Sequence, residues 1–218
     1  MERIILFDLD GTLTNPFEGI TKCVQYALDS FGIYEPDLEK LTPFIGPPLI
    51  DSFMNFYNFT EEEATEAVKK YRERFSTVGL FENEPYEGIP EMLEELQKQG
   101  DVLAVASSKP EVFVNRILEH FHMKQYFHVV VGSELDGRRT AKEEVIEEVF
   151  CRLQHKAEDY DVAIMVGDRE YDVIGAKRWN MISVGVTYGF AFPGELERAG
   201  ADYVVSTIGE LLKMITNN

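Results

Sequence analysis

Six short runs of apolar, mostly β-branched residues recur along the chain and limit its fold more than any other feature. They do not alternate with polar residues, so each has the pattern of a strand buried on both faces. Segments with helical periodicity lie between them. Strand, helix and strand in repetition predict an α/β fold with a doubly wound parallel sheet. The runs are Ile4–Phe7, Val102–Ala106, Val129–Val131, Val162–Val166, Ile182–Val186 and Tyr203–Val205, and the helical segments include Pro90–Lys98, Val112–Phe121 and Thr140–Leu153.

A long stretch without a convincing strand separates the first two runs. It spans about ninety residues, far more than one crossover needs. Asn15-Pro16 and Glu84-Pro85 bracket it as punctuation signals. We expect a small helical domain at residues 16–82, inserted into an α/β core made of residues 1–15 and 83–218. Its helical patterns are Ile20–Phe31, Leu49–Tyr57 and Glu61–Phe75.

Composition bounds the class of protein and its partners. The 218 residues are 44% hydrophobic and 28% charged, as in an ordinary globular protein. The 21 basic and 39 acidic residues give a net charge of −18, which argues against nucleic-acid polymers and anionic membranes as partners. No apolar run approaches a membrane span, and the short one before Asp8 is no secretory signal. Two cysteines, Cys23 and Cys151, cannot form a disulfide framework, so we expect a soluble, cytoplasmic protein.

Polar residues follow four of the strand patterns. In an open parallel sheet, ligands bind beyond the carboxyl ends of the strands, so we expect these groups to meet at one edge. Several acids near one point need a divalent cation, and hard carboxylate oxygens favour Mg²⁺. The groups are Asp8 and Asp10, Ser107-Ser108-Lys109-Pro110, Arg138-Arg139-Thr140-Ala141-Lys142, and Gly167 to Asp172.

Asp8 and Asp10 would share one face if the chain stays extended after the first strand. An EF-hand loop is the alternative metal site, but Gly11 comes at the fourth position instead of the sixth, and Gly19 replaces the bidentate glutamate. A simple turn explains Asp10-Gly11 alone and leaves Asp8 unexplained. The pair therefore favours chemistry over a turn.

Two of these segments have the signature of a capped helix start. Ser108 with Glu111, and Thr140 with Glu143, have the spacing of a capping box. Each box would place a lysine in the first helical turn, where the helix dipole disfavours a cation. The two lysines are Lys109 and Lys142.

A bound anion would explain both lysines, because free N–H groups at a helix start bind anions. Ser107 stands one residue before the first cap, so its hydroxyl is expected to face the same anion. Arg138 and Arg139 either add to this site or are loop charges.

Asp168 and Asp172 are four residues apart and become neighbours if a helix starts there. Like charges in that position are mildly destabilising unless a cation lies between them. Gly167 fits a tight turn that brings the backbone close to the site.

These residues resemble the motifs of the haloacid-dehalogenase-like hydrolases. The stretch Phe7-Asp8-Leu9-Asp10-Gly11-Thr12-Leu13 is similar to the first motif, Ser107 to the second, Lys142 to the third, and Gly167-Asp168 with Asp172 to the fourth. The resemblance spans the whole chain and implies a Rossmann-like core with a helical cap inserted after the first motif. The sequence looks most like the phosphoglycolate-phosphatase-like branch, which contains proteins described as 5′-nucleotidases.

The resemblance implies roles for the four acids. Asp8 would be the nucleophile and form an aspartyl-phosphate, while Asp10 would protonate the leaving oxygen and then activate water. Mg²⁺ would be held by Asp8, by the carbonyl of Asp10 and by Asp168, with Asp172 orienting ligating water.

The resemblance also implies contacts to the substrate. Ser107, Ser108 and Lys142 would hold the phosphoryl oxygens. The cap would carry selectivity, because the Phe44–Pro48 segment is similar to the substrate-facing loop of that branch. The candidate cap residues are Phe17, Lys22, Phe44, Gly46 and Pro47.

We therefore expect a Mg²⁺-dependent phosphatase of a small phosphorylated metabolite, phosphoglycolate or a 5′-nucleotide, as a monomer or homodimer. A phosphotransferase or sugar phosphomutase, and a non-catalytic regulatory protein, are the alternatives. Sugar phosphomutases tend to carry a histidine where this chain has Ile20, which disfavours that activity. Arg169 stands where the family often has a small residue, and we expect it to form a surface ion pair.

Overall fold

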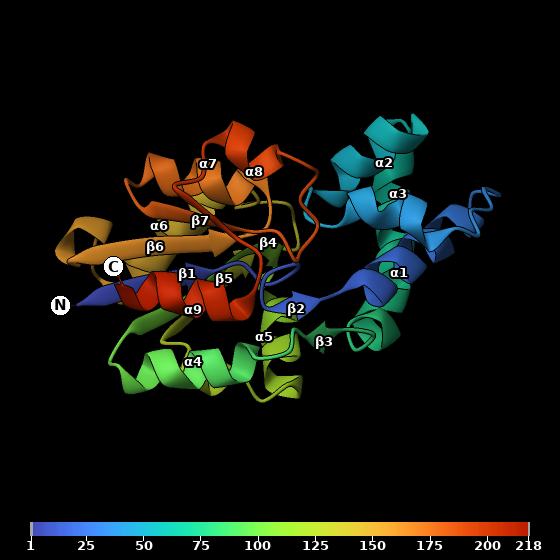
Figure 1. Ribbon diagram of the computed structural model, residues 1–218. Helices are drawn as coiled ribbons and strands as arrows, with labels where there is room; N and C mark the ends of the chain where they lie inside the picture. Colours follow the sequence, from blue (N-terminus) through green and yellow to red (C-terminus); the bar gives the residue numbers. More distant parts are fainter. Residues whose placement is uncertain (1, 218) are drawn as a thin grey trace. The chain divides into compact units, whose positions relative to one another are not determined.

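A six-stranded sheet with β1 (Arg3–Phe7) near its centre organises the larger part of the protein (Figure 1). The computed structural model describes residues 2–217, and the strand order within them is β5-β4-β1-β6-β7-β8. Every neighbouring pair is parallel, with Ile5 aligned to Leu103 on one side and to Ile164 on the other. The predicted parallel α/β sheet is confirmed. The other strands are β4 (Val102–Pro110), β5 (Val129–Ser133), β6 (Val162–Gly167), β7 (Ile182–Val186) and β8 (Tyr203–Val205).

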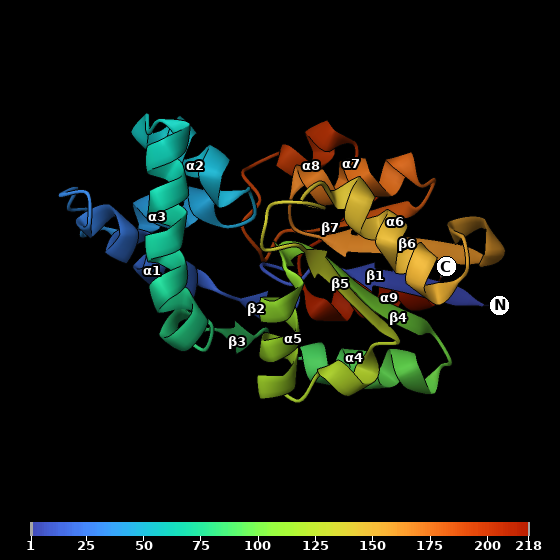
Figure 2. The ribbon, with the colours of Figure 1, turned by 180° about the vertical axis from the view of Figure 1, so that it is seen from behind.

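Helices cover both faces of this sheet, as the two opposite views show (Figures 1 and 2). One face carries α6 (Lys142–Leu153) and α7 (Glu170–Arg178), and the short α8 (Glu195–Ala199) lies beside α7. The other face carries α4 (Ile89–Lys98), α5 (Glu111–His120) and α9 (Ile208–Asn217). The helices on the two faces together bury the central strands β1, β4 and β6 on both sides, which is why their sequences do not alternate with polar residues.

The core under α6 shows how the sheet is held. Ile4 and Leu6 are fully buried with Val145, Ile146 and Val149 of α6 in one hydrophobic cluster. Burial of side chains of this size contributes about 1.5–3 kcal/mol each. This packing fixes where α6 begins, and α6 begins with Lys142 at the carboxyl edge of the sheet.

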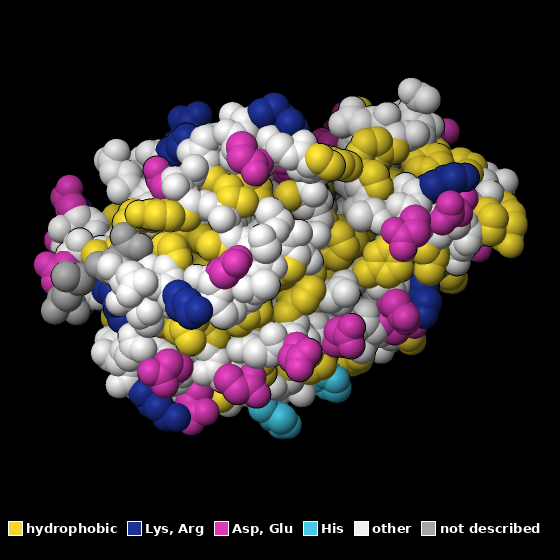
Figure 3. Space-filling view, viewed as in Figure 1, with side chains coloured by type: hydrophobic (Ala, Val, Ile, Leu, Met, Phe, Trp, Pro, Cys, Tyr) yellow, Lys and Arg dark blue, Asp and Glu magenta, His cyan; other side chains and the backbone are white. Residues whose placement is uncertain are grey.

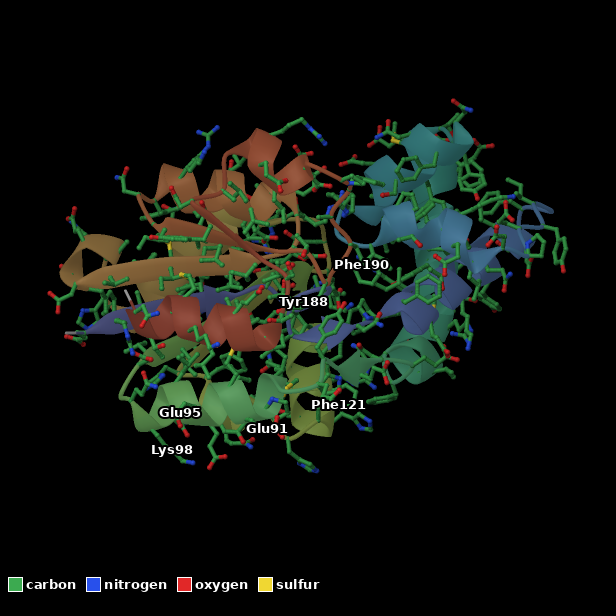
Figure 4. All side chains as sticks on the ribbon, viewed as in Figure 1. Glu91, Glu95, Lys98, Phe121, Tyr188 and Phe190 are labelled. Carbon is green, nitrogen blue, oxygen red and sulfur yellow. The ribbon has the colours of Figure 1, made fainter. Side chains whose placement is uncertain are left out.

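α4 has one buried apolar face and one exposed charged face. Met92 and Leu93 are buried, whereas Glu91, Glu95 and Lys98 project away from the sheet (Figure 4). Acidic side chains accordingly line this edge in the space-filling view (Figure 3). Within residues 2–217, no helix has both the length and the apolar character needed to cross a membrane.

The chain divides into two compact units, and Pro16–Glu84 forms the second of them. It contains α1 (Phe17–Asp29), a 3₁₀ segment (Leu38–Phe44), α2 (Leu49–Tyr57), α3 (Glu61–Arg74) and a π-helical turn (Phe75–Gly79). The two places where the chain passes between the units pair as a small sheet of β2 (Thr14–Asn15) and β3 (Glu84–Pro85).

Local sequence explains why α3 starts where it does. The amide of Glu63 donates to the Thr60 hydroxyl at 3.2 Å, and the amide of Thr60 donates to the Glu63 carboxylate at 2.8 Å. This capping box satisfies two amides that the helix itself leaves without partners.

The capping box predicted at Ser108 is wrong. Ser108 lies within β4, and α5 starts at Glu111 with no side-chain cap. The Glu111 carboxylate accepts two hydrogen bonds from Arg152, at 3.0 and 2.9 Å, and one from the amide of Gly132 at 3.3 Å. The two hydrogen bonds from the Arg152 guanidinium hold the Glu111 carboxylate more strongly than the single bond to the Ser108 amide that a capping box would provide.

The box predicted at Thr140 is also wrong, by one residue. The Glu144 carboxylate accepts from the amide of Ala141 at 3.4 Å, and α6 starts at Lys142. Lys142 therefore does lie in the first turn of its helix, as predicted.

An aromatic cluster forms the core of the Pro16–Glu84 unit, and it includes Phe44, one of the predicted substrate contacts. The ring centroid of Phe44 lies 5.0 Å from that of Phe53 and 5.3 Å from that of Phe56. Phe44 is only 2% exposed. A side chain packed in this way has no surface to offer a ligand, so Phe44 is not retained as a substrate contact.

We predict that Phe44→Ala lowers the free energy of unfolding by about 3–5 kcal/mol, because it leaves a cavity among these rings. Phe56→Ala, which removes a ring that is 49% exposed, should cost markedly less. Urea unfolding followed by circular dichroism measures both, and equal midpoints for the two variants would contradict the assignment of Phe44 to the core.

Candidate active site

Three carboxylates meet at the carboxyl edge of the sheet. Asp8 follows β1, Asp168 follows β6, and Asp172 lies in the first turn of α7. The amide of Asp8 donates to the carbonyl of Val166 at 2.9 Å, so the β1–β6 pairing continues to the site itself. One carboxylate oxygen from each acid lies within 4.8 Å of the others, and all three residues are buried. The sequence-predicted convergence of these acids is what the structure contains.

One ammonium group lies among them. Lys142 Nζ lies 3.1 Å from Asp8 Oδ1 and 2.8 Å from Asp172 Oδ1, and it donates to the carbonyl of Ala106 at 2.8 Å. Burial would lower the pKa of Lys142, but the charges of Asp172 and Asp8 outweigh burial and raise it above its ordinary value. The lysine therefore remains a cation, and one positive charge faces three carboxylates.

Burial and the neighbouring charges both shift the pKa of these acids. Burial, followed by the charges of Asp172 and Asp8, raises the pKa of Asp168 well above its ordinary value. Burial also raises the pKa of Asp172 to about 6, although Lys142 acts in the opposite direction. Asp168 Oδ2 accepts from the amide of Phe190 at 2.7 Å, whereas the buried Oδ1 has no hydrogen-bond partner.

A divalent cation fits this set of groups. Buried polar atoms almost always have partners, so the bare Asp168 Oδ1 among like charges points to a positive ligand. Hard carboxylate oxygens are the donors that Mg²⁺ and Ca²⁺ prefer. Within the described part of the chain, this is the one group of acids, histidines or cysteines close enough together to hold an ion.

Asp10 has different surroundings from these three acids. Its Oδ2 bonds the ammonium of Lys109 at 2.5 Å, and both side chains are largely buried. Burial raises the pKa of Asp10, and Lys109 opposes this rise without cancelling it. The Asp10 carboxylate is not part of the acid cluster, and the predicted contact of its main-chain carbonyl with a metal stays a prediction.

The serines lie beside this second pair. Ser107 is 2% exposed in β4, and its hydroxyl accepts from the amide of Lys109 at 3.3 Å. Ser108 is half-buried one residue further along the strand. Lys109 was predicted in a helical turn, but it lies at the end of β4, from where its side chain contacts Asp10. Sequence spacing alone carried no sign of this ion pair.

Glycines make room for the acids. Gly11 has a left-handed backbone, with φ of +81°, and a Cβ there would overlap the Asp168 carboxylate. Gly167 is the last residue of β6 instead of part of the predicted tight turn, and a Cβ there would overlap the Asp172 carboxylate. Gly175 on α7 is similar, since a Cβ would lie 2.7 Å from Lys142 Cγ.

Arg169 forms an ion pair, as expected, but a buried one. Its Nε lies 2.8 Å from Glu195 Oε1, and the two side chains are 7% and 5% exposed. Sequence reasoning missed Glu195 because it does not directly follow a strand. Arg138 and Arg139 are loop charges, paired with acids that include Glu134 and Asp136.

The other candidate cap residues lie in the Pro16–Glu84 unit. Phe17 opens α1, and Lys22 pairs with Glu18 at 2.8 Å. Gly46 is exposed with φ of +108°, and Pro47 follows it. Their part in selectivity stays a prediction.

We predict that Asp168→Asn raises the stability of the metal-free protein at pH 8. Folding favours protonated Asp168 and Asp172, so their contribution to stability falls as pH rises through the folded pKa, which is near 6 for Asp172. An amide removes one charge, and the gain should be about 1 kcal/mol or more, or about 2–4 °C in melting temperature.

The measurement is thermal unfolding in chelator. Asp101→Asn is the matched control. Asp101 accepts a hydrogen bond from Arg3 at 2.7 Å, so this variant should have a lower melting temperature than the wild type. A metal-free Asp168→Asn protein that melts at or below the wild type would contradict the electrostatic analysis.

Comparisons with known proteins identify the family of this chain. Residues 5–186 match the family model described as haloacid dehalogenase-like hydrolase. The chain is 47% identical to a protein of Pseudomonas aeruginosa named 5′-nucleotidase, with 98% of this chain and 96% of that protein covered. It is 34% identical to the tyrosine-protein kinase PtkA of Mycobacterium tuberculosis, over 96% of this chain and 71% of that protein. A crystal structure of a predicted phosphatase from Clostridium acetobutylicum superposes with a TM-score of 0.95 at 51% identity, covering 100% of both chains.

Proposed function

This chain belongs to the haloacid dehalogenase-like hydrolases, and on that premise we propose that it is a Mg²⁺-dependent phosphatase of small phosphomonoesters. One observation carries the proposal. Buried Asp8, Asp168 and Asp172 lie together at the carboxyl edge of the sheet, and Lys142 contacts Asp8 and Asp172. Phosphoryl transfer asks a protein mainly for positioning and for stabilisation of negative charge, and this cluster is suited to both.

The acids of the cluster would hold the metal ion. Asp8 and Asp168 would be carboxylate ligands, the Asp10 carbonyl a third, and Asp172 would lie beside them. When bound, Mg²⁺ supplies positive charge to the phosphoryl oxygens and to the neighbouring acids.

Asp8 is the proposed nucleophile. It is 8% exposed, so the cluster does not seal it off. Its carboxylate would attack phosphorus, forming an aspartyl-phosphate while the bond from phosphorus to the ester oxygen breaks. Lys142, 3.1 Å away, would offset the charge of Asp8 and then contact the transferred group. The Ser107 hydroxyl would donate to the same phosphoryl oxygens.

Asp10 is the proposed acid and base. Burial raises its pKa and Lys109 opposes the rise, so the net shift is in the direction that a general acid needs. Asp10 would give a proton to the departing oxygen, and the resulting carboxylate would take a proton from the water that attacks the aspartyl-phosphate. Lys109 would hold the Asp10 side chain in place through their hydrogen bond.

We predict that Asp8→Asn abolishes phosphatase turnover, because an amide cannot serve as the nucleophile. Asp10→Asn should lower kcat by about 10²–10⁴, the usual contribution of a general acid and base. Steady-state hydrolysis of a chromogenic phenyl phosphate measures both.

Asp136→Asn is the matched control, since Asp136 is exposed and pairs only with loop charge. It should keep wild-type activity. Chelation should abolish wild-type turnover and added Mg²⁺ should restore it. Turnover that persists in Asp8→Asn would remove Asp8 as nucleophile, and turnover that persists in chelator would remove the metal.

The proposed substrate class is a nucleoside 5′-monophosphate, and phosphoglycolate is the runner-up. The support for the first is the 47% identical relative named 5′-nucleotidase. A second candidate activity is transfer to an acceptor other than water, which the relative named tyrosine-protein kinase favours.

We predict that nucleoside 5′-monophosphates rank above phosphoglycolate and sugar phosphates by kcat/KM, with one free phosphate released per ester cleaved. Parallel assays of ester loss and phosphate release, with and without a tyrosine-containing peptide, measure this. A phosphate yield that falls when the peptide is present, with phosphotyrosine formed, would favour the transferase.

A further inference from the structure

The segment between β7 and α8 contacts the acid cluster directly. The amide of Phe190 donates to Asp168 Oδ2 at 2.7 Å, and the Tyr188 hydroxyl donates to the carbonyl of Thr12 at 3.1 Å. A Cβ on Gly189 would lie 2.5 Å from Asp168 Cβ, so the backbone itself lies against that side chain. Figure 4 shows Tyr188 and Phe190 on this segment, near the carboxyl ends of the strands.

Glu195 closes the segment and holds it at its far end. Glu195 Oε2 accepts from the amide of Phe192 at 2.9 Å, within the segment. Oε1 accepts from the amide of Glu170 at 2.9 Å and from Arg169 Nε at 2.8 Å. Three donors therefore converge on one buried carboxylate.

Arg169 connects this carboxylate to the acids. It follows Asp168 in the chain, and its amide donates to Asp172 Oδ2 at 3.1 Å. Its guanidinium carbon lies 5.3 Å from the centroid of the Phe192 ring, so Arg169 contacts the segment through both Glu195 and Phe192. A buried ion pair is weak evidence for added stability, because removing two charges from water is costly. A specific role in orientation explains it better.

We propose that Arg169 and Glu195 are positioning residues for the metal ligand Asp168. They hold the segment 187–195 so that the Phe190 amide occupies Asp168 Oδ2 and directs Oδ1 into the cluster. The inference rests on the proposed function, since it takes the cluster to be a Mg²⁺ site. Neither residue touches the reacting atoms in this scheme, and both act through Asp168.

Glu195→Gln tests this with little change in shape. The amide of glutamine replaces one acceptor oxygen with a donor, which must then face the Phe192 amide or the pair of donors from Arg169 and Glu170. We expect Mg²⁺ affinity, measured by calorimetry on the full chain, to fall about tenfold, as for other residues that orient metal ligands. We also expect faster hydrogen exchange at the Phe190 amide in metal-free protein. Arg169→Met should change both measurements as Glu195→Gln does. Arg169→Lys should lose less Mg²⁺ affinity, because it keeps the positive charge.

Asp101→Asn is the control for general destabilisation. The Arg3–Asp101 ion pair is similarly buried, at 12% and 3% exposure and 2.7 Å, but lies at the start of β1 and before β4, away from the acids. It should lower the melting temperature without changing Mg²⁺ affinity or Phe190 exchange.

Two results would overturn the inference: wild-type affinity and exchange in Glu195→Gln, or an equal loss of affinity in Asp101→Asn. Failure of the wild-type protein to bind Mg²⁺ would instead overturn the proposed metal site. Hydrogen exchange at Phe190 would then still decide whether Arg169 and Glu195 hold the segment.

Discussion

The buried contact of Lys142 with Asp8 and Asp172 is the interaction on which the rest of the site depends. One ammonium cannot balance three carboxylates that lie within 4.8 Å of one another, so the metal-free site is electrostatically incomplete. Burial raises the pKa of Asp168 and of Asp172, and the charges of neighbouring carboxylates add to this rise. Burial of unbalanced charge costs folding free energy, and the same excess of negative charge creates affinity for a divalent cation.

The fold supplies this arrangement through two devices. Parallel strands end at one edge, which brings Asp8 and Asp168 together although they are far apart in the chain. Glycines then remove the side chains that would collide with the acids, at Gly11 beside Asp168 and at Gly167 beside Asp172. Hydrophobic packing of α6 against the sheet places its first residue, Lys142, beside Asp8 and Asp172. Stability of the core thus holds together a group of charges that would otherwise separate.

Sequence patterns predicted the sheet and most of the site because both follow from short-range rules. Non-alternating apolar runs predict buried strands. The polar residues that follow these runs include Asp8, Asp168 and Lys142, which were therefore predicted to lie at the site. Two failures are local, namely the one-residue shift of the capping box at Thr140 and the place of Gly167 in β6, and the others concern contacts made over long separations. Arg152 binds the Glu111 carboxylate that a capping box at Ser108 would need. The sequence around Ser108 contains no signal of this distant contact. Lys109 and Asp10 are also far apart in the sequence. Glu195 does not directly follow a strand, so the rule that found the other site residues could not find it.

The most direct test of the account is a crystal structure grown with Mg²⁺ and beryllofluoride, which mimics a phosphoryl group on a carboxylate. The account predicts beryllium bonded to the Asp8 carboxylate, with Mg²⁺ ligated by Asp8 and Asp168. It also predicts that Lys142 contacts a fluorine. Beryllofluoride on another residue, or Mg²⁺ bound away from Asp168, would contradict it.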